Sequence, residues 1–307
     1  MSETEVLALL TDLKREVADI KVALATSQRT LREVRDLVGP FGVAMPDGSM
    51  LVQTLYGIKY LIDPLDLIIG PQLIVYRQWE ADLSAMTWAH AHKDMVFVDV
   101  GANFGYFTCL LGSRIGRTGS GRVYAVEPNP ACIELLRKNV AINWSMAPIT
   151  IHPCAVGAAS TQLDLVVPKN RSANGALVGR RPAPIAATDA VYTVAVEPLD
   201  DLLPEGEVVD LIKIDVEGHE WAVLAGARKV VARSPGLRII MEWAPLQMTS
   251  AGYTADDMVS LFDELGLDAY RQTPGFRLAE PSGTPLDRAA LGALSYDNIV
   301  LAPRPRG

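Results

Sequence analysis

From Lys93 onward, short apolar segments alternate with longer segments of helical periodicity. The run DMVFVDV (94–100) precedes YFTCLLGSRIG (106–116), and the same order recurs with the apolar runs RVYAVEP, DLIKIDV and LRIIMEW. Strands that alternate with helices in this way form a mainly parallel sheet covered by helices on both faces. The sequence therefore predicts an α/β domain over 93–303.

The first 38 residues have a different pattern. Apolar residues recur in alternating steps of four and three, with Ser27 as one polar interruption, at Val6, Leu10, Leu13, Val17, Ile20, Leu24, Leu31, Val34 and Val38. This heptad spacing predicts a coiled-coil helix over 1–38 that joins copies of the chain into a homo-oligomer. A single amphipathic helix packed on its own domain is the alternative, and the mixed core residues do not choose between dimer and trimer.

Residues 39–92 connect the two parts. GPFGVAMPDGS (39–49) has the glycine and proline content of a linker. YGIKYLIDPLDLIIG (56–70) predicts a short hairpin, followed by a helix near 73–92, and together they form a cap ahead of the main domain. Residues 168–190 have little apolar periodicity and are expected to form a mobile loop or a lid.

The charge and composition of the chain argue against several classes of protein. The chain has 36 acidic and 28 basic residues and a net charge of −8, which disfavours a nucleic-acid partner. It has no apolar run of 18 residues, and Glu3 and Glu5 lie where a secretory signal has basic residues, so we expect a cytoplasmic protein without a membrane span. Three separated cysteines favour reduced core thiols.

Acidic residues stand at the ends of four predicted strands: Asp99, Glu127, Asp215 and Glu242. In open parallel sheets the ligand lies outside these carboxyl ends. The loop after the first strand has the spacing DxGxxxG, with Gly101 and Gly105, and lacks the GxGxxG of dinucleotide binders. Glu127 lies at a strand end from which a carboxylate can accept hydrogen bonds from both hydroxyls of a ribose. The predicted ligand therefore contains a ribose, lacks a pyrophosphate and carries positive charge. S-adenosylmethionine meets each of these requirements.

Five motifs, VDVGANFGYFT, YAVEPNP, VEPLDDLL, LIKIDVEGHEW and DNIVL, occur in an order that resembles the FkbM family of S-adenosylmethionine-dependent methyltransferases. The resemblance covers about residues 51–301 and implies a class I methyltransferase (Rossmann-like) sheet with an antiparallel last strand. It also implies O-methylation of a hydroxyl on a sugar-containing or polyketide-like natural product.

The resemblance also implies which individual residues bind the cofactor. It implies that Asp99, Gly101, Asn103 and Gly105 surround the methionine part of S-adenosylmethionine and that Glu127 holds the ribose. It further implies that Pro128 and Asn129 lie beside the ribose and adenine, and that Cys154 and Ala155 line the adenine pocket.

Three residues are candidates for the general base that removes the acceptor proton. His219 is the first choice because imidazole titrates near neutrality and Glu242 or Asp215 could orient it. Asp215 could instead hold the amino group of the cofactor. A divalent metal bound by Asp215, His219 and Glu242 is not favoured, because the ligands are few.

In the cap, Tyr76 and Glu80 are expected to contact the acceptor together with Glu217, since an aromatic face and carboxylates suit a sugar. Trp79 is expected to pack on the core. Two rival functions stay open: a catalytically inactive methyltransferase-fold scaffold assembled through its coiled coil, and a nicotinamide-dependent oxidoreductase, which the glycine spacing disfavours. The N-terminal helix could also dock the enzyme onto a biosynthetic complex.

Overall fold

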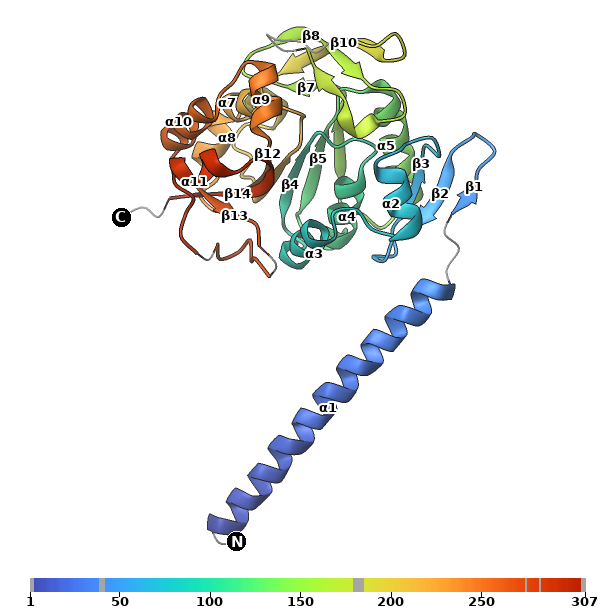
Figure 1. Cartoon of the computed structure of the whole chain (residues 1–307), viewed down its shortest axis with the longest axis vertical. Helices are drawn as coiled ribbons and strands as arrows, with labels where there is room; N and C mark the ends of the chain where they lie inside the picture. Colours follow the sequence, from blue (N-terminus) through green and yellow to red (C-terminus); the bar gives the residue numbers. More distant parts are fainter. Residues whose placement is uncertain (1–2, 39–41, 179–184, 274, 282, 305–307) are drawn as a thin grey trace. The chain divides into compact units, whose positions relative to one another are not determined.

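The computed structural model describes residues 3–38, 42–178, 185–273, 275–281 and 283–304. The chain divides into two compact units, Met1–Phe41 and Gly42–Gly307. The first unit contains the single helix α1 (Glu3–Val38), which confirms the expected long N-terminal helix (Figure 1). Side chains of its heptad series, among them Leu13, Ile20 and Leu24, are exposed. The coiled coil itself stays a prediction.

A seven-stranded sheet forms the centre of the second unit. Its order is β13-β14-β12-β11-β4-β5-β6, with β14 antiparallel to both neighbours and the remaining pairs parallel. The strands span Leu267–Arg271 (β13), Asp297–Pro303 (β14), Arg238–Trp243 (β12), Leu211–Ile214 (β11), Val96–Val100 (β4), Arg122–Val126 (β5) and Ile149–His152 (β6). This arrangement confirms the class I methyltransferase fold, including its antiparallel last strand.

Helices cover both faces of this sheet, as the alternation predicts. Val96, Val98 and Val100 of β4 point to one core, and Phe97 between them points to the other. The valine face is covered by α6 (Leu199–Leu202), α7 (Glu220–Ala225), α8 (Arg228–Arg233), α9 (Pro245–Ala251), α10 (Ala255–Leu265) and α11 (Arg288–Ala293). The opposite face is covered by α2 (Ile69–Val75), α3 (Ala81–His90), α4 (Tyr106–Ile115) and α5 (Pro130–Ile142).

Residues 42–92 form the cap region. Strands β1 (Val43–Ala44), β2 (Met50–Gln53) and β3 (Lys59–Ile62) make an antiparallel sheet. Asn139 of α5 fastens this sheet to the main domain: its amide accepts from Leu61 N at 2.6 Å and donates to the carbonyls of Leu61 (3.1 Å) and Phe104 (2.8 Å). The expected helix near 73–92 is two helices, because Arg77 and Glu80 have positive φ between α2 and α3.

A second small sheet follows the main sheet strand β6. Its order is β7-β10-β8-β9, with bounds Ala155–Val156 (β7), Ala190–Glu197 (β10), Thr161–Val167 (β8) and Ala176–Leu177 (β9). The segment 168–190, expected as a mobile loop or lid, thus contains the short helix η1 (Ser172–Asn174) and strand β9, while residues 179–184 lie outside the described residues.

Residues 220–233, EWAVLAGARKVVAR, form two helices, α7 and α8, with a turn at Gly226. A Cβ on Gly226 would lie 2.0 Å from the carbonyl oxygen of Gly157, so this turn requires glycine for close backbone approach.

None of the helices that the structure describes is both long enough and apolar enough to cross a bilayer.

Candidate active site

A cavity of about 210 Å³ lies at the carboxyl ends of β4, β5, β11 and β12. Asp99, Glu127, Asp215 and Glu242 all contribute to its lining. The four acidic strand ends of the sequence are therefore brought together at one site, on the edge of the sheet where ligands bind in this class of fold.

The loop after β4 requires its first glycine. Gly101 has φ 81°, and a Cβ there would lie 1.9 Å from the carbonyl oxygen of Asp215. The Gly101 amide donates to the carbonyl of Val126 at 3.0 Å. Asn103 follows with φ 52°, and its side-chain oxygen accepts from the amide of Phe104 at 2.8 Å. The loop is thus held close to the ends of both neighbouring strands, and Gly101 and Asn103 line the cavity.

Glu127 is fixed by two backbone amides. Its carboxylate accepts from the amide of Asn103 at 2.7 Å and from the amide of Asn129 at 2.7 Å. The side chain is buried, and burial raises its pKa to about 7, although both amide hydrogen bonds act in the opposite direction. Each carboxylate oxygen keeps a further lone pair, so Glu127 is an oriented acceptor at the wall of the cavity.

Asp99 and Lys213 form the inner part of the site. Asp99 Oδ2 accepts from Thr108 Oγ1 at 2.6 Å, whereas its buried Oδ1 has no hydrogen-bond partner. Burial raises the pKa of Asp99. Lys213 Nζ donates to Asp215 Oδ2 at 2.7 Å and lies 4.9 Å from the centroid of the Phe107 ring. Burial alone would lower the pKa of Lys213, but the carboxylates around it raise it, so the ammonium stays charged.

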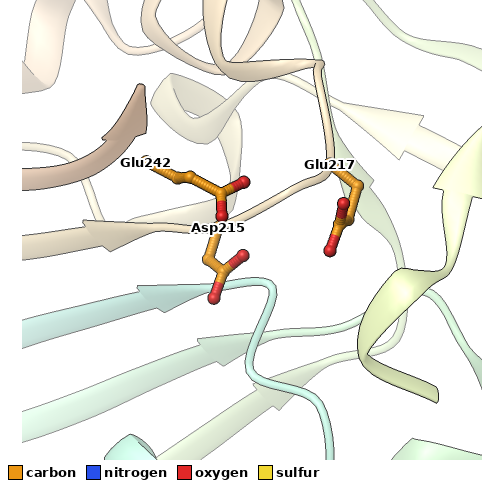
Figure 2. Close-up of side chains that lie close together, drawn as sticks. All are labelled: Asp215, Glu217 and Glu242. Atoms are coloured by element: carbon orange, nitrogen blue, oxygen red, sulfur yellow. The ribbon is translucent and has the colours of Figure 1, made fainter. Parts of the chain in front are cut away.

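Three carboxylates converge at the other end of the cavity. Asp215 follows β11, Glu217 follows two residues later with φ 53°, and Glu242 lies on β12. One oxygen from each lies within 4.8 Å of the others, and Figure 2 shows the side chains turned toward a common region. Burial and the charge of Glu242 raise the pKa of Glu217 to about 8, and burial and Asp215 raise that of Glu242 to about 7.

Neighbouring polar side chains hold two of these carboxylates. Tyr296 donates to Glu242 Oε1 at 2.5 Å, and Gln247 donates to Glu217 Oε2. Asn174 also approaches Glu217 Oε1, at 3.5 Å. Glu242 Oε2 is buried without a partner. The acidic group therefore has fixed orientations and keeps acceptor atoms that no protein donor satisfies.

His219 lies at the start of α7 and lines the same cavity. Its side chain does not cap the helix, and its Nδ1 is buried without a hydrogen-bond partner. Burial lowers its pKa to about 4, so the imidazole is neutral at physiological pH. The expectation that Asp215 or Glu242 orients the ring is wrong for Nδ1, because that nitrogen has no partner.

The side of the cavity beyond Glu127 is less polar. Pro128, Asn129, Cys154 and Ala155 all line it. Asn129 is also the N-cap of α5, with its side chain accepting from Ala131 N at 3.1 Å. Burial raises the pKa of Cys154 to about 11, so it remains a thiol near neutrality. These residues offer a weakly polar wall adjacent to an oriented carboxylate.

Of the three cap residues considered in the sequence, Trp79 and Glu80 line the site and Tyr76 does not. Glu80 and Trp79 contribute to the lining, and Glu80 has its Oε2 buried without a partner and a pKa raised by burial. Trp79 was expected only to pack on the core. Tyr76 is 61 % exposed and lies outside the lining. Gly105 also lies outside it; a Cβ there would meet Leu136 Cδ1 at 2.3 Å, so this glycine permits packing of α4 on α5.

The structure adds residues that sequence analysis missed. Lys213 is one, and its signal was a single charged residue inside the apolar run LIKI. The segment 172–175 is another, because it lines the cavity from the small sheet region. Ser172 Oγ donates to Asp66 Oδ2 at 2.7 Å, and Leu67 N donates to the carbonyl of Asn170 at 2.9 Å, which together tie this segment to the cap.

The chain has detectable similarity to known methyltransferases. The family model described as the Methyltransferase FkbM domain matches residues 99–268. The hexuronic acid methyltransferase AglP of Haloferax volcanii is 31% identical over 156 residues, an alignment that covers 48% of this chain and 56% of that protein. The methyltransferase sdnD of Sordaria araneosa is 29% identical over 164 residues, covering 45% and 62%. The chain thus spans roughly three-fifths of these relatives.

Solved structures with similar folds include TYW2 of P. horikoshii in complex with MeSAdo. It shares 13% sequence identity and a TM-score of 0.42 over 83% of this chain and 70% of that chain.

Proposed function

Because the chain belongs to the FkbM methyltransferase family, we propose that it transfers a methyl group from S-adenosylmethionine to a hydroxyl of a sugar-containing or polyketide-like acceptor. The observation that carries this proposal is one cavity with an oriented carboxylate, Glu127, on one side and the carboxylates of Asp215, Glu217 and Glu242 on the other. The similarity to a protein named as a hexuronic acid methyltransferase supports a sugar as acceptor.

The residues of the cavity fit S-adenosylmethionine. Glu127 has lone pairs for the two ribose hydroxyls, and the wall with Pro128, Cys154 and Ala155 suits an adenine ring. Asp99 and Glu80 each have a buried oxygen without a donor, which an ammonium group would satisfy. The surrounding negative charge favours a cationic ligand.

When bound, S-adenosylmethionine supplies an electrophilic methyl group whose sulfonium accepts the electron pair of the breaking carbon–sulfur bond as the acceptor oxygen bonds to the methyl carbon. The protein has to hold the acceptor in line, and such alignment contributes on the order of 7–11 kcal/mol to lowering the barrier. It also has to take the hydroxyl proton. His219 lines the cavity and is neutral, and a neutral imidazole has one ring nitrogen with a free lone pair, so we assign it the role of general base.

Methyl transfer from labelled S-adenosylmethionine to a panel of hydroxylated glycosides tests this proposal. We expect a methyl ether product and S-adenosylhomocysteine from the wild type. His219→Ala is expected to lower kcat by about 100-fold, in the range of general-base contributions, while cofactor binding is retained. His92→Ala, in the turn after α3 and outside the cavity lining, is the control. Cofactor binding without turnover on any hydroxyl would favour the inactive scaffold.

We further propose that α1 joins copies of the chain. The heptad residues Leu13, Ile20 and Leu24 are 56, 65 and 57 % exposed, and a second copy of the helix offers the same spacing of apolar side chains. Ile20→Asp is therefore expected to reduce the solution mass to that of one chain. Val22→Asp is the matched control, because Val22 is equally exposed (67 %) but lies off the heptad series. Analytical ultracentrifugation that shows the same assembly for both variants and the wild type contradicts this proposal.

A further inference from the structure

The group formed by Asp215, Glu217 and Glu242 has the geometry of a cation site. One carboxylate oxygen from each residue lies within 4.8 Å of the other two. The three side chains come from β12 and from the segment after β11, and they approach the common region from different sides (Figure 2). Oxygen ligands around a hard divalent cation stand about 2.0–2.6 Å from the metal, so opposite ligands lie about 4–5 Å apart.

The charges in this group are only partly compensated. Lys213 donates to Asp215 and offsets the negative charge of that carboxylate. Tyr296 and Gln247 donate hydrogen bonds to Glu242 and Glu217 but bring no charge. Carboxylates this close repel one another unless a cation lies between them.

Buried polar atoms without a hydrogen-bond partner also point to a ligand at this group. Glu242 is only 9 % exposed, points into the group, and has no hydrogen-bond partner at Oε2. His219 is 6 % exposed, lines the same cavity, and has no partner at Nδ1. Polar atoms buried at this depth are normally satisfied, and a cation satisfies carboxylate acceptors that have no donor.

We infer that Asp215, Glu217 and Glu242 bind a hard divalent cation of the Mg²⁺ or Mn²⁺ class at the acceptor end of the cavity. Carboxylate oxygens select this class over softer metals, and water or an acceptor oxygen completes the coordination. From the sequence, a metal held by Asp215, His219 and Glu242 was not favoured because the ligands were few; the structure groups Asp215 and Glu242 with Glu217.

The role of this cation rests on the proposed function, whereas its binding does not. A hydroxyl oxygen bound to the cation has a lowered pKa and a fixed direction. With the methyl donor bound, the hydroxyl proton would pass to His219 as the oxygen bonds to the methyl carbon, and the carbon–sulfur electron pair would return to sulfur. The cation makes the proton transfer easier, and His219 remains the proton acceptor.

Binding is measured on the full chain after treatment with EDTA and dialysis, by Mn²⁺ electron paramagnetic resonance and by calorimetry with Mg²⁺. We expect one saturable site in the wild type. Glu242→Gln is expected to weaken Mn²⁺ binding by about tenfold or more, since it removes an anionic ligand. Glu217→Gln is a second variant that leaves the Lys213–Asp215 pair intact. Glu134→Gln, an exposed carboxylate of α5, removes one charge elsewhere and is expected to leave binding unchanged.

Three results overturn the inference. The first is the absence of saturable Mn²⁺ binding to the folded wild type, and the second is binding that Glu242→Gln and Glu217→Gln both leave unchanged. The third is competition: if S-adenosylhomocysteine displaces Mn²⁺, the carboxylates hold the ammonium group of the cofactor rather than a metal. Because these experiments use no acceptor, failure of the metal site and failure of methyl transfer are separate outcomes.

Discussion

Replacing Glu127 by alanine is expected to weaken binding of S-adenosylmethionine by about 1,000-fold. A carboxylate that accepts from both ribose hydroxyls contributes about 2 kcal/mol for each charge-assisted hydrogen bond, and both are lost together. Another side chain cannot easily take over this role, because the amides of Asn103 and Asn129 both donate to the Glu127 carboxylate and fix its orientation. Calorimetric titration of wild type and variant measures the effect.

A carboxylate outside the cavity provides the control for this loss. Glu207 accepts from the Tyr124 hydroxyl at 2.8 Å and pairs with Arg122, but it does not line the cavity. Glu207→Ala is therefore expected to retain full affinity for the cofactor. Equal affinities of wild type and Glu127→Ala would remove Glu127 from the ribose site.

The same side chain predicts a pH dependence of cofactor affinity. Burial raises the pKa of Glu127 to about 7, so the free protein carries a proton there at lower pH. If the ribose hydroxyls favour the ionised carboxylate, binding has to displace that proton. Affinity then falls by up to about tenfold per pH unit below pH 7 and levels off above it. Glu127→Gln, which does not titrate, is expected to show a smaller slope, because Glu217 and Glu242 of the same cavity still titrate.

Replacing Lys213 by methionine is expected to destabilise the protein by about 3 kcal/mol. Lys213 is 5 % exposed, and its ammonium pairs with Asp215 while its charge also acts on Glu80 and Asp99. Methionine fills similar space but leaves these carboxylates without a counter-charge, and breaking a buried pair costs about 3–5 kcal/mol. We place the value at the lower end because the Asp215 side chain is 34 % exposed. Urea unfolding monitored by circular dichroism measures it.

An exposed ion pair provides the control that distinguishes the destabilisation of Lys213→Met from the effect of removing any positive charge. Arg271 donates to Asp297 at 2.6 Å at the protein surface. Arg271→Met is expected to change the free energy of unfolding by about 0–1 kcal/mol, as is usual for surface pairs. If Lys213→Met and Arg271→Met have the same free energy of unfolding, the charge of Lys213 does not stabilise the fold around the cavity.

The pattern of the chain predicts much of the fold because each strand and helix carries a local signal. The apolar runs that end at Val100, Val126 and Ile214 form parallel strands, and the terminal DNIVL forms the antiparallel strand β14. Because the carboxyl ends of parallel strands lie at the same edge of a sheet, this pattern also places Asp99, Glu127, Asp215 and Glu242 at one edge. That these residues lie at one site can therefore be predicted from the strand pattern alone, without knowledge of contacts between distant segments.

The rest of the site depends on contacts between distant segments. Asn174 meets Glu217 because Ser172 is tied to Asp66 of the cap, and no periodicity in residues 168–178 announces this packing. Tyr296 reaches Glu242 through the pairing of β12 with β14. The exposure of Tyr76 depends on where α2 ends and the chain turns. Such tertiary contacts have no local signature.

The most direct test of the account is calorimetric titration of the wild-type protein with S-adenosylhomocysteine and, separately, with NAD. We predict saturable one-site binding of S-adenosylhomocysteine and no binding of NAD, because Glu127 fits a ribose while the DxGxxxG loop lacks the spacing that holds a pyrophosphate. Binding of NAD without binding of S-adenosylhomocysteine would contradict the assignment of this cavity to a methyl donor.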